Sequence, residues 1–410
     1  MTRLALVVGG LVAAAVFFGV WRTVAVMAAV ILMIMLHELG HYVMARRAGM
    51  KVTEFFLGFG PRLWSIRRGE TEYGIKAIPV GGYVRVIGMN NLDEVDPADE
   101  QRTYRAKGYL ARLAMASAGS IVHFLLAFLL LVGIYAGTGV LDSDKATATP
   151  VIDEVSTTAQ FGGQASPAAK AGLRSGDRLV ALDGQPVRSW ADVPAYIGPR
   201  VEQPIVLTID RDGSRFDITV VTASSKKVRN DEVATGLIGI LPEVDPGPVE
   251  RVNPVVAAGR AGKQLVSLTG QTVTGLVRMF TPSSIGDYGD QLAGKPLSDP
   301  AAEGNRFLSP VGLVNLASDV SAIGLREVLM LLVLINVFVG MFNMIPLPPF
   351  DGGHVAVATY EAIRSKISGR RYQVDMNKLL PVAWGVIILL MLISVTALYL
   401  DIKNPINLNG

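Results

Sequence analysis

The sequence predicts a polytopic α-helical membrane protein with four core transmembrane helices, one extra N-terminal helix, a cytoplasmic-side β-sheet and a β-rich extracytoplasmic module. Half of its 410 residues are apolar and only 18% are charged. Its mean hydropathy of +0.40 is too high for an ordinary soluble enzyme. Because the chain has no cysteine, disulfides, a thiol nucleophile, a thiolate zinc site and a cysteine-ligated iron–sulfur cluster are all excluded.

The first apolar stretch is long enough for two spans of about 20 residues each. Residues 4–36 are apolar apart from the stretch Trp21-Arg22-Thr23. Tryptophan and arginine favour the depth of the lipid headgroups. We therefore expect a helical hairpin over 4–20 and 23–45, and one long helix with a protruding end is the alternative.

The distribution of lysine and arginine predicts the orientation of the chain. Basic residues are concentrated in 46–112 and 351–379, so the positive-inside rule puts these stretches in the cytoplasm and 136–325 on the other side. The expected segments are an extra N-terminal hydrophobic segment (1–22), a transmembrane helix (23–48), a membrane-associated β-sheet region (49–90), a cytoplasmic connector (91–112), a transmembrane helix (113–135), an exported module (148–245), an amphipathic membrane-surface helix (253–281), a linker (282–325), a transmembrane helix (326–352), a cytoplasmic segment (353–379) and a last transmembrane helix (380–402).

Two of the four histidines stand in the sequence His37-Glu38-Leu39-Gly40-His41, within the second predicted span. Residues four apart share one face of a helix, so His37 and His41 can bind one zinc ion. Glu38 stands beside them and can accept a proton from a water molecule. Unpaired polar residues in a span are costly, which strengthens this interpretation. The alternative is that the histidines bond only to each other or to backbone carbonyls.

A catalytic zinc needs a third protein ligand. Glu54 is the nearest acid along the chain, but it lies in a strand-like stretch. Asp351 lies at the end of the 327–346 span, on the same predicted side of the membrane as His41, after prolines that must unwind the helix. A carboxylate also neutralises one charge of the dication, so Asp351 is the better candidate and His354 is its rival.

The exported region contains short strands, tight turns and short helices. Asp183-Gly184 predicts a hairpin turn, and 204–210 and 215–222 alternate as strands. Together with the stretch from Ser166 to Asp177, this pattern resembles a bacterial PDZ domain over 148–245. The resemblance implies that a peptide C-terminus binds by strand addition at Gly236, Leu237, Ile238, Gly239 and Ile240. A degenerate module without a ligand is the alternative.

The two membrane motifs resemble those of the site-2 protease family of intramembrane zinc metalloproteases. That family carries His-Glu-x-x-His in one core span and Asn-x-x-Pro-x-x-x-x-Asp-Gly in a later one, and both are intact here, at His37–His41 and Asn343–Gly352. The likeness extends through Gly58–Pro61, Thr71–Tyr73, Ile78–Tyr83, Gly88-Met89 and Ser309–Gly312. Within that family, the chain most resembles the bacterial single-PDZ proteases that process anti-sigma factors.

The resemblance implies a role for each matching residue. One zinc ion per chain is held by His37, His41 and Asp351, and Glu38 is the general base. Asn343 helps to position the scissile strand or its oxyanion. The candidate substrate-binding residues are Asn343, Pro346, His123 and Gly82.

One position departs from the family pattern. Many members carry Gly-Pro-x-x-Asn in the second core span, whereas this chain has Gly119-Ser-Ile-Val-His123. His123 either fixes a substrate backbone in place of that asparagine or bonds to a neighbouring helix.

The β-sheet region near the active site is expected to contain strands at 52–58, 62–68, 71–78 and 82–87. An unpaired edge of such a sheet can add a strand from an unwound substrate helix. An ordinary cytoplasmic sheet without a substrate role is the alternative.

The expected function is hydrolysis of a peptide bond in or near the transmembrane segment of single-span proteins, with an anti-sigma factor already cut on its outer side as the expected substrate. The expected location is the bacterial cytoplasmic membrane, with the PDZ domain outside and the active site near the cytoplasmic face. The expected partners are the substrate, the lipid bilayer and protein C-termini, and no nucleic acid. A zinc-dependent or ion-coupled transporter is a second hypothesis, disfavoured by the missing inverted repeat. A catalytically dead scaffold is a third.

Overall fold

The computed structural model describes residues 17, 21–89, 93–141, 147–156, 165–229, 233–245, 249–295 and 306–403. The expected helix over 4–20 lies outside these residues, apart from Phe17. The chain divides into two compact units, and the first comprises 1–138, 252–292 and 306–410. The second comprises 139–251 and 293–305.

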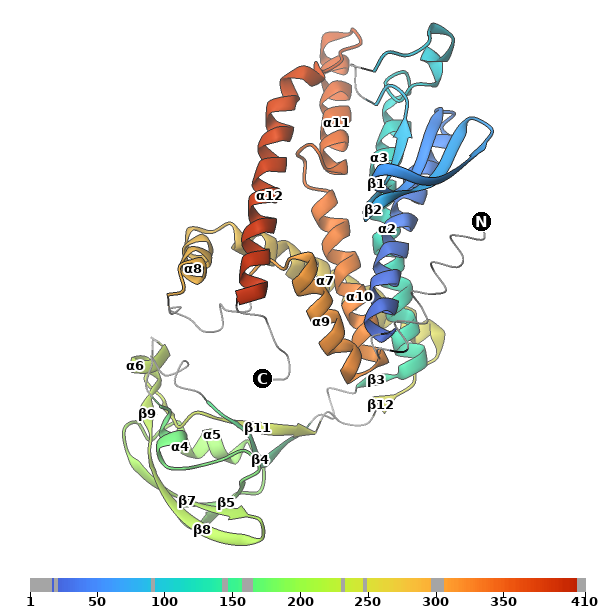
Figure 1. Cartoon of the computed structure of the whole chain (residues 1–410). Helices are drawn as coiled ribbons and strands as arrows, with labels where there is room; N and C mark the ends of the chain where they lie inside the picture. Colours follow the sequence, from blue (N-terminus) through green and yellow to red (C-terminus); the bar gives the residue numbers. More distant parts are fainter. Residues whose placement is uncertain are drawn as a thin grey trace. The chain divides into compact units, whose positions relative to one another are not determined.

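The first unit is a bundle of long apolar helices. Its main helices are α2 (Trp21–Arg47), α3 (Tyr109–Gly133), α10 (Leu325–Asn343) and α12 (Leu380–Lys403). Helix α3 continues into a short π-helical turn, Ile134–Thr138. Four helical segments of the described chain are long and apolar enough to cross a membrane, and they correspond to these four helices. In Figure 1, α2 and α3 lie side by side, and α10 packs against α3.

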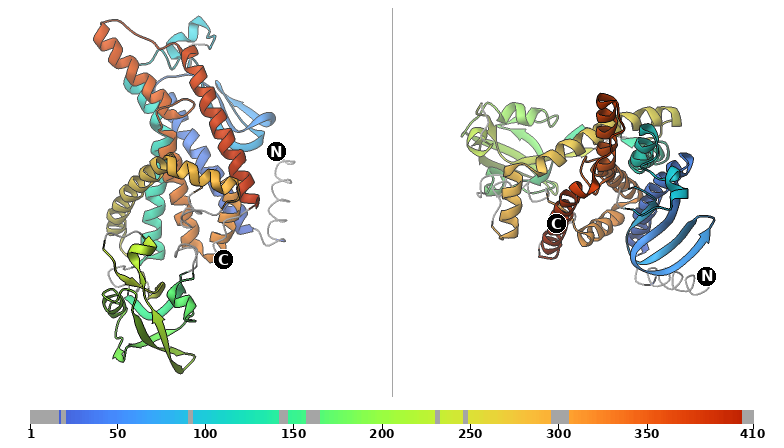
Figure 2. Two further views of the ribbon diagram at one scale, coloured as in Figure 1. Left: turned by 90° about the vertical axis from the view of Figure 1, so that its left-hand side faces the viewer. Right: turned by 90° about the horizontal axis from the view of Figure 1, so that it is seen from above.

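A second set of helices surrounds this bundle. Helix α7 (Pro254–Met279) crosses it against α3 and α10 (Figure 2). The helix begins at Asn253, whose side chain accepts hydrogen bonds from the backbone N–H groups of Val255 and Val256. It occupies the stretch where the sequence predicts an amphipathic helix.

Two helices replace most of the predicted linker 282–325. They are α8 (Pro282–Leu292) and α9 (Pro310–Ile323). Helix α9 starts at a strong capping signal, because the Ser309 hydroxyl accepts a hydrogen bond from the Gly312 N–H and a proline follows at the first position. Tertiary contact supports α8, whose Tyr288 hydroxyl bonds to Thr396 of α12 at 2.9 Å. The glycine, serine and aspartate content of this stretch favoured an irregular linker, and that prediction is wrong over 282–292 and 310–323.

The predicted span 326–352 is also shorter than expected. Helix α10 ends at Asn343, the stretch 344–350 is irregular, and a separate helix, α11 (Asp351–Ser368), begins at the aspartate. The prolines of the irregular stretch explain the break, because proline lacks the N–H that continues a helix.

The β-sheet region is one long curved hairpin of β1 (Val52–Arg68) and β2 (Thr71–Val86). The segment 54–57 of β1 pairs on both sides, so that Phe55 lies opposite both Val84 and Tyr73. The four predicted strands are thus segments of two bent strands, in the spatial order 82–86, 52–57, 72–75 and 64–68.

The second unit is built on a sheet whose main strand order is β11-β4-β5-β7-β8. Its elements are β4 (Thr147–Val155), α4 (Pro167–Lys170), β5 (Arg178–Leu182), β6 (Gln185–Pro186), α5 (Asp192–Ile197), β7 (Pro204–Arg211), β8 (Ser214–Val221), β9 (Ala223–Ser224), α6 (Ser225–Arg229), β10 (Gly236–Leu237) and β11 (Ile240–Asp245), flanked by the paired strands β3 (Val140–Leu141) and β12 (Val249–Glu250). Buried aliphatic residues such as Ile152, Leu179 and Leu207 form its core.

A buried aspartate braces this second unit. Asp177 accepts hydrogen bonds from Arg211 Nε at 2.6 Å, from Arg211 Nη2 at 2.8 Å and from the Arg174 backbone N–H at 2.8 Å. Burial by itself would raise the pKa of this carboxyl group, but these bonds to the charged form outweigh burial and lower the pKa. The Asp177 carboxylate therefore stabilises the folded unit.

Candidate metal centre

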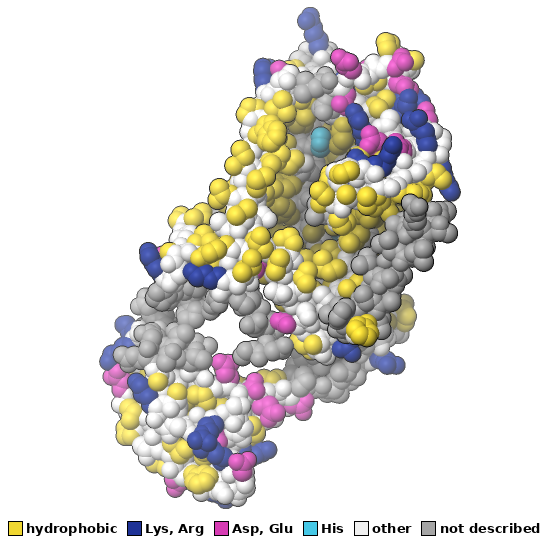
Figure 3. All heavy atoms as spheres, in the orientation of Figure 1, with side chains coloured by type: hydrophobic (Ala, Val, Ile, Leu, Met, Phe, Trp, Pro, Cys, Tyr) yellow, Lys and Arg dark blue, Asp and Glu magenta, His cyan; other side chains and the backbone are white. Residues whose placement is uncertain are grey.

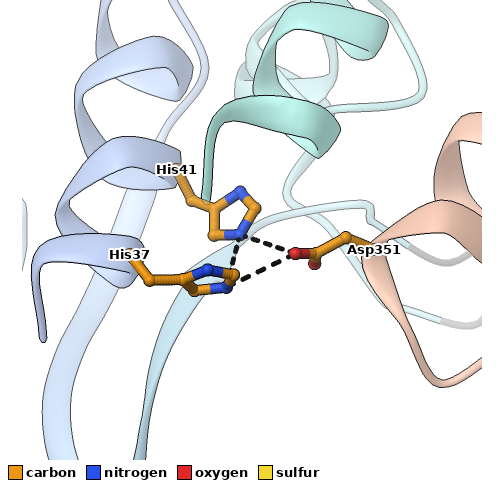
Figure 4. Close-up of side chains that lie close together, drawn as sticks. All are labelled: His37, His41 and Asp351. Atoms are coloured by element: carbon orange, nitrogen blue, oxygen red, sulfur yellow. Dashed lines mark hydrogen bonds and ion pairs between the residues drawn. The ribbon is translucent and has the colours of Figure 1, made fainter. Parts of the chain in front are cut away.

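Three side chains from two helices meet at one point of the first unit (Figure 4). His37 and His41 come from α2, and Asp351 is the first residue of α11. His41 Nε2 lies 3.1 Å from His37 Nε2 and 3.2 Å from Asp351 Oδ2, and His37 Nε2 lies 3.4 Å from the same oxygen. Two imidazole nitrogens and one carboxylate oxygen, all within 4.8 Å, are the donor set of a three-ligand catalytic zinc site.

A glycine of α3 allows the two histidine rings to lie in this position. A Cβ atom on Gly119 would lie 2.3 Å from His37 Cε1 and 2.5 Å from His41 Nε2. A Cβ atom on Gly40 would lie 2.9 Å from the Val122 side chain. The two helices therefore approach each other where both lack side chains, and α3 forms one wall of the site.

The two histidines differ in the hydrogen bonding of their Nδ1 atoms. His41 Nδ1 lies 2.8 Å from the Met115 carbonyl oxygen and donates to it, which leaves Nε2 free to bind a metal. His37 Nδ1 is buried and has no hydrogen-bond partner among the described residues. Only His41 thus has the fixed tautomer that is typical of a metal ligand.

The irregular stretch after α10 places Asp351. A Cβ atom on Gly352 would lie 2.3 Å from the Met344 carbonyl oxygen, and one on Gly353 would lie 2.7 Å from Pro348 N. Both glycines therefore let the first turn of α11 rest directly on this stretch.

The other candidate ligands lie outside the cluster. The ring of His354, the rival of Asp351, packs edge-on against the ring of Tyr104, with the centroids 6.2 Å apart. Glu54 bonds to Tyr83 and to Arg85. Neither belongs to a group of described residues with metal-binding geometry.

The β1–β2 hairpin contacts the catalytic candidate Glu38. A Cβ atom on Gly82 would lie 2.9 Å from Glu38 Cγ and 3.3 Å from the Phe56 carbonyl oxygen. The structure therefore brings together Gly82 and Glu38, which are far apart in the sequence.

His123 is held by a residue that sequence reasoning missed. Its Nδ1 lies 2.8 Å from Oδ1 of Asn336 on α10, whose Nδ2 donates to the Leu332 carbonyl oxygen at 2.8 Å. The ring centroid of His123 is 5.0 Å from that of His37. His123 thus bonds to a neighbouring helix and also borders the metal centre. An asparagine in the middle of an apolar span was the available signal.

Asn343 and Pro346 lie outside the cluster, in the segment that leads to Asp351. Asn343 is the last residue of α10, and Pro346 lies in the irregular stretch. In the described part of the chain, neither residue forms a hydrogen bond with the three clustered side chains. Figure 3 shows apolar side chains over the helices of this unit and one histidine side chain visible between α12 and the β1–β2 hairpin.

The predicted peptide-binding residues lie in the second unit. Gly236 and Leu237 form β10, which pairs with β9, and Ile240 begins β11. The Gly236 N–H donates to the Gly198 carbonyl oxygen at 2.8 Å, so β10 rests on the end of α5. Gly239 has a φ of +81°, a conformation that favours glycine. The stretch therefore joins the end of α5 to the edge strand of the sheet.

Comparison with known proteins identifies the family. The model of peptidase family M50 matches residues 25–391. The chain is 32% identical to the zinc metalloprotease Rip1 of Mycobacterium tuberculosis over 93% of this chain and 96% of the relative. It is also 32% identical to Rip1 of Mycolicibacterium smegmatis over 93% of this chain and 97% of the relative. Among solved structures, the PDZ domain of an SdrC-like protein of Listeria innocua matches 24% of this chain and 93% of that domain, at 20% identity and a TM-score of 0.19. The chain therefore belongs to peptidase family M50, the site-2 protease family, and is a zinc metalloprotease.

Proposed function

We propose that this protein hydrolyses a peptide bond in or near the transmembrane segment of single-span membrane proteins. The observation that carries the proposal is the cluster of His37, His41 and Asp351 at an end of helices that are long and apolar enough to span a membrane. Glu38 directly follows His37 in the sequence and lies against Gly82 of the hairpin. A hydrolytic site within such helices suits substrates that are themselves in the membrane.

Each residue of the cluster has a proposed task. His37, His41 and Asp351 would hold zinc, which when bound polarises a carbonyl group and makes a water molecule a better nucleophile. The single carboxylate neutralises one of the two positive charges. Glu38 accepts a proton from the attacking water and delivers it to the leaving amine.

The substrate must be extended at the point of cleavage, because the carbonyl groups of a helix are already engaged in hydrogen bonds. The segment 82–86 forms one outer edge of the curved hairpin and lies beside Glu38. A substrate strand added at this edge would bring its peptide bond to the catalytic carboxylate. Because Gly82 has no side chain, the backbones can approach closely.

We further propose that Asn343, Pro346 and His123 border the substrate. Asn343 carries an amide at the end of α10, where it can bond to a substrate backbone or to a developing oxyanion. Pro346 keeps the neighbouring stretch irregular. His123 is oriented by Asn336, so a role in substrate positioning is compatible with its bond to α10.

The membrane orientation is part of the proposal. Arg46 and Arg47 occupy the last turn of α2, next to the metal centre, and basic residues favour the cytoplasmic side. We therefore infer an active site near the cytoplasmic face of a bacterial cytoplasmic membrane, with the second unit outside. The α7 helix, with Arg260 and Lys263 on its exposed surface, would lie along the membrane surface.

We assign the second unit to peptide binding. In the described sheet, β11 is an edge strand, and its Leu241 and Val244 are 47% and 54% exposed. The stretch Gly236–Ile240 precedes this edge and could hold a C-terminal carboxylate with its backbone N–H groups. An anti-sigma factor trimmed on its outer side is the proposed substrate, in keeping with the resemblance to the single-PDZ subtype.

The proposal is tested by Glu38→Gln in the purified full chain. This variant should keep its zinc and cleave a reporter transmembrane segment about 10²–10⁴-fold more slowly, because it lacks the general base. Glu94→Gln, which alters an exposed acid, is the matched control and should cleave at the normal rate. Equal cleavage by the Glu38 variant and the wild type would overturn the protease assignment of this site.

The orientation has its own test. Arg174 is exposed in the second unit, so trypsin added to the outside of intact spheroplasts should cut there. Cleavage only after the membrane is broken would reverse the proposed orientation.

A further inference from the structure

The helix that presents Asp351 is held to α3 by a buried ion pair. Arg112 Nη1 lies 2.7 Å from Glu361 Oε2, and the two side chains are only 11% and 8% exposed. Arg112 is in the first turn of α3, and Glu361 lies ~15 Å beyond Asp351 along α11. The pair is therefore remote from the metal centre, although it joins two of the helices that build it.

Glu361 also fixes the chain that follows α11. Its Oε1 accepts a hydrogen bond from the Val374 backbone N–H at 2.6 Å. Nearby, the Tyr372 N–H donates to Ser365 Oγ at 2.8 Å. One carboxylate thus connects α3, α11 and the turn that leads to α12.

A small polar cavity adjoins the pair. Its volume is about 20 Å³, and its lining includes Tyr104, His354 and both members of the pair. The guanidinium of Arg112 also lies over the Tyr104 ring, 4.9 Å from its centroid. Tyr104 Oη and Arg112 Nε are buried without a hydrogen-bond partner among the described residues. A cavity of this size admits one water molecule, which would bond to both atoms.

We propose that Arg112 and Glu361 are positioning residues for the zinc ligand Asp351. Asp351 is the one ligand of the cluster that does not come from α2, and the irregular stretch before it is not held by a regular hydrogen-bond ladder. Its place therefore depends on the packing of α11 against α3 as well as on that stretch. Helix α3 also packs against the rings of His37 and His41, at Gly119. The ion pair thus connects α11, which carries Asp351, to α3, which packs against the two histidines.

The inference rests on the proposed zinc-dependent function, and zinc affinity tests it without a measurement of cleavage. Zinc is titrated into the metal-free full chain in competition with a chromophoric chelator. Glu361→Ala and Arg112→Ala should each weaken zinc binding about 10- to 100-fold, the usual effect of losing a group that orients a ligand. The double variant Arg112→Glu with Glu361→Arg should recover part of this loss. Unchanged zinc affinity in both single variants would overturn the inference.

A second buried ion pair provides the matched control. Arg306 Nη2 lies 3.2 Å from Asp401 Oδ1, and both side chains are 1% exposed. Asp401 belongs to α12, which contributes no residue to the cluster. Asp401→Ala removes one member of a buried ion pair, as Glu361→Ala does, so both should lower the unfolding midpoint, but only Glu361→Ala should weaken zinc binding. An equal loss of zinc affinity in both would mean general destabilisation and would overturn the inference.

The two proposals fail in different ways. If Glu361→Ala does not fold, Glu361→Gln is measured instead, because it keeps the shape of the side chain and removes its charge. Failure of the wild-type chain to bind zinc would count against the proposed function. Normal binding by the wild type and by these variants would count against the positioning role alone.

Discussion

The two units place their functional groups in different ways. In the helical unit, the proposed function depends on three particular side chains whose ligand atoms lie within 4.8 Å of one another. In the second unit, the proposed groove depends on the backbone of the stretch Gly236–Ile240 and of β11. A metal ligand must be one of a few residue types, whereas a strand edge can be formed by many sequences. A metal site can therefore be recognised from a sequence motif, whereas a strand-edge groove is recognised mainly from the fold.

The difference also concerns tolerance to substitution. The metal centre is enclosed by close helix contacts, and a single added methyl group meets ligand atoms there. The edge strand β11 faces outward with exposed Leu241 and Val244. We therefore expect the largest effects of substitution in the helical unit and the smaller ones in the second unit.

Asp351→Asn should have the largest effect on the metal centre. The amide cannot neutralise a charge of the dication and is a poorer zinc ligand than a carboxylate. We expect zinc affinity to fall by more than ~100-fold, while the second unit keeps its folding. Chelator competition on the purified chain measures the affinity.

Glu54→Gln is the control for this prediction, since it removes another carboxylate that bonds to Tyr83 and Arg85. Its zinc affinity should equal that of the wild type. If zinc content followed Glu54 or His354 rather than Asp351, the assignment of the third ligand would be incorrect even if the protein remained a protease.

Gly119→Ala should act through close packing rather than through loss of a ligand. The new Cβ atom would lie about 2.5 Å or less from ring atoms of His37 and His41, so α3 or the rings must move. We expect zinc affinity to fall by about 10-fold or more. Gly133→Ala on the same helix is the matched control, because no atom lies within 4 Å of its Cβ position. Equal zinc affinities for the two variants would show that α3 does not form a wall of the site.

Much of the metal centre could be predicted from the sequence, because its chemistry restricts the residue types. The i, i+4 spacing of His37 and His41 predicts a shared helix face. In the structure the two histidines and Asp351 form one cluster. The four long apolar helices were predictable for a similar reason, since the bilayer dictates their length and composition.

The supporting contacts could not be predicted, because they depend on which helices become neighbours. Asn336 and Glu361 are ordinary polar residues in the sequence, and their partners His123 and Arg112 are more than 200 residues away. Helix α8 was missed for the same reason, since a contact with α12 supports a stretch whose composition favours a loop. Local pattern cannot reveal an interaction that only the tertiary fold creates.

Gly236→Ala should disturb the second unit and leave the metal centre intact. A Cβ atom there would lie 2.3 Å from the carbonyl oxygens of Ile197 and Arg200, so β10 must move away from the end of α5. Overpacking of this kind costs about 1–3 kcal/mol. We expect weaker binding of C-terminal peptides, measured by fluorescence anisotropy, with unchanged zinc affinity. Unchanged peptide binding would contradict the assignment of this stretch to the groove.

The smallest expected effect is a pH-dependent loss of stability in Asp177→Asn. The bonds from Arg211 and Arg174 lower the pKa of Asp177 despite its burial. A carboxyl group with a lowered folded-state pKa contributes stability above its unfolded pKa of about 3.9, and this contribution disappears as the pH falls through the folded-state pKa. At pH 7 the variant should therefore lose about 1–2 kcal/mol.

The urea midpoint for unfolding of the second unit measures this loss in the full chain. Trp190 packs against the core of this unit. It serves as the fluorescent probe when the other tryptophans are replaced by phenylalanine. The difference between wild type and variant should stay constant from pH 8 to about pH 5 and shrink below about pH 4. Asp217→Asn, which alters an exposed aspartate bonded to Thr208, should show a much smaller difference. A difference for Asp177→Asn that grows in acid would mean that the carboxylate does not brace this unit, and the backbone groove would then depend on other contacts for its rigidity.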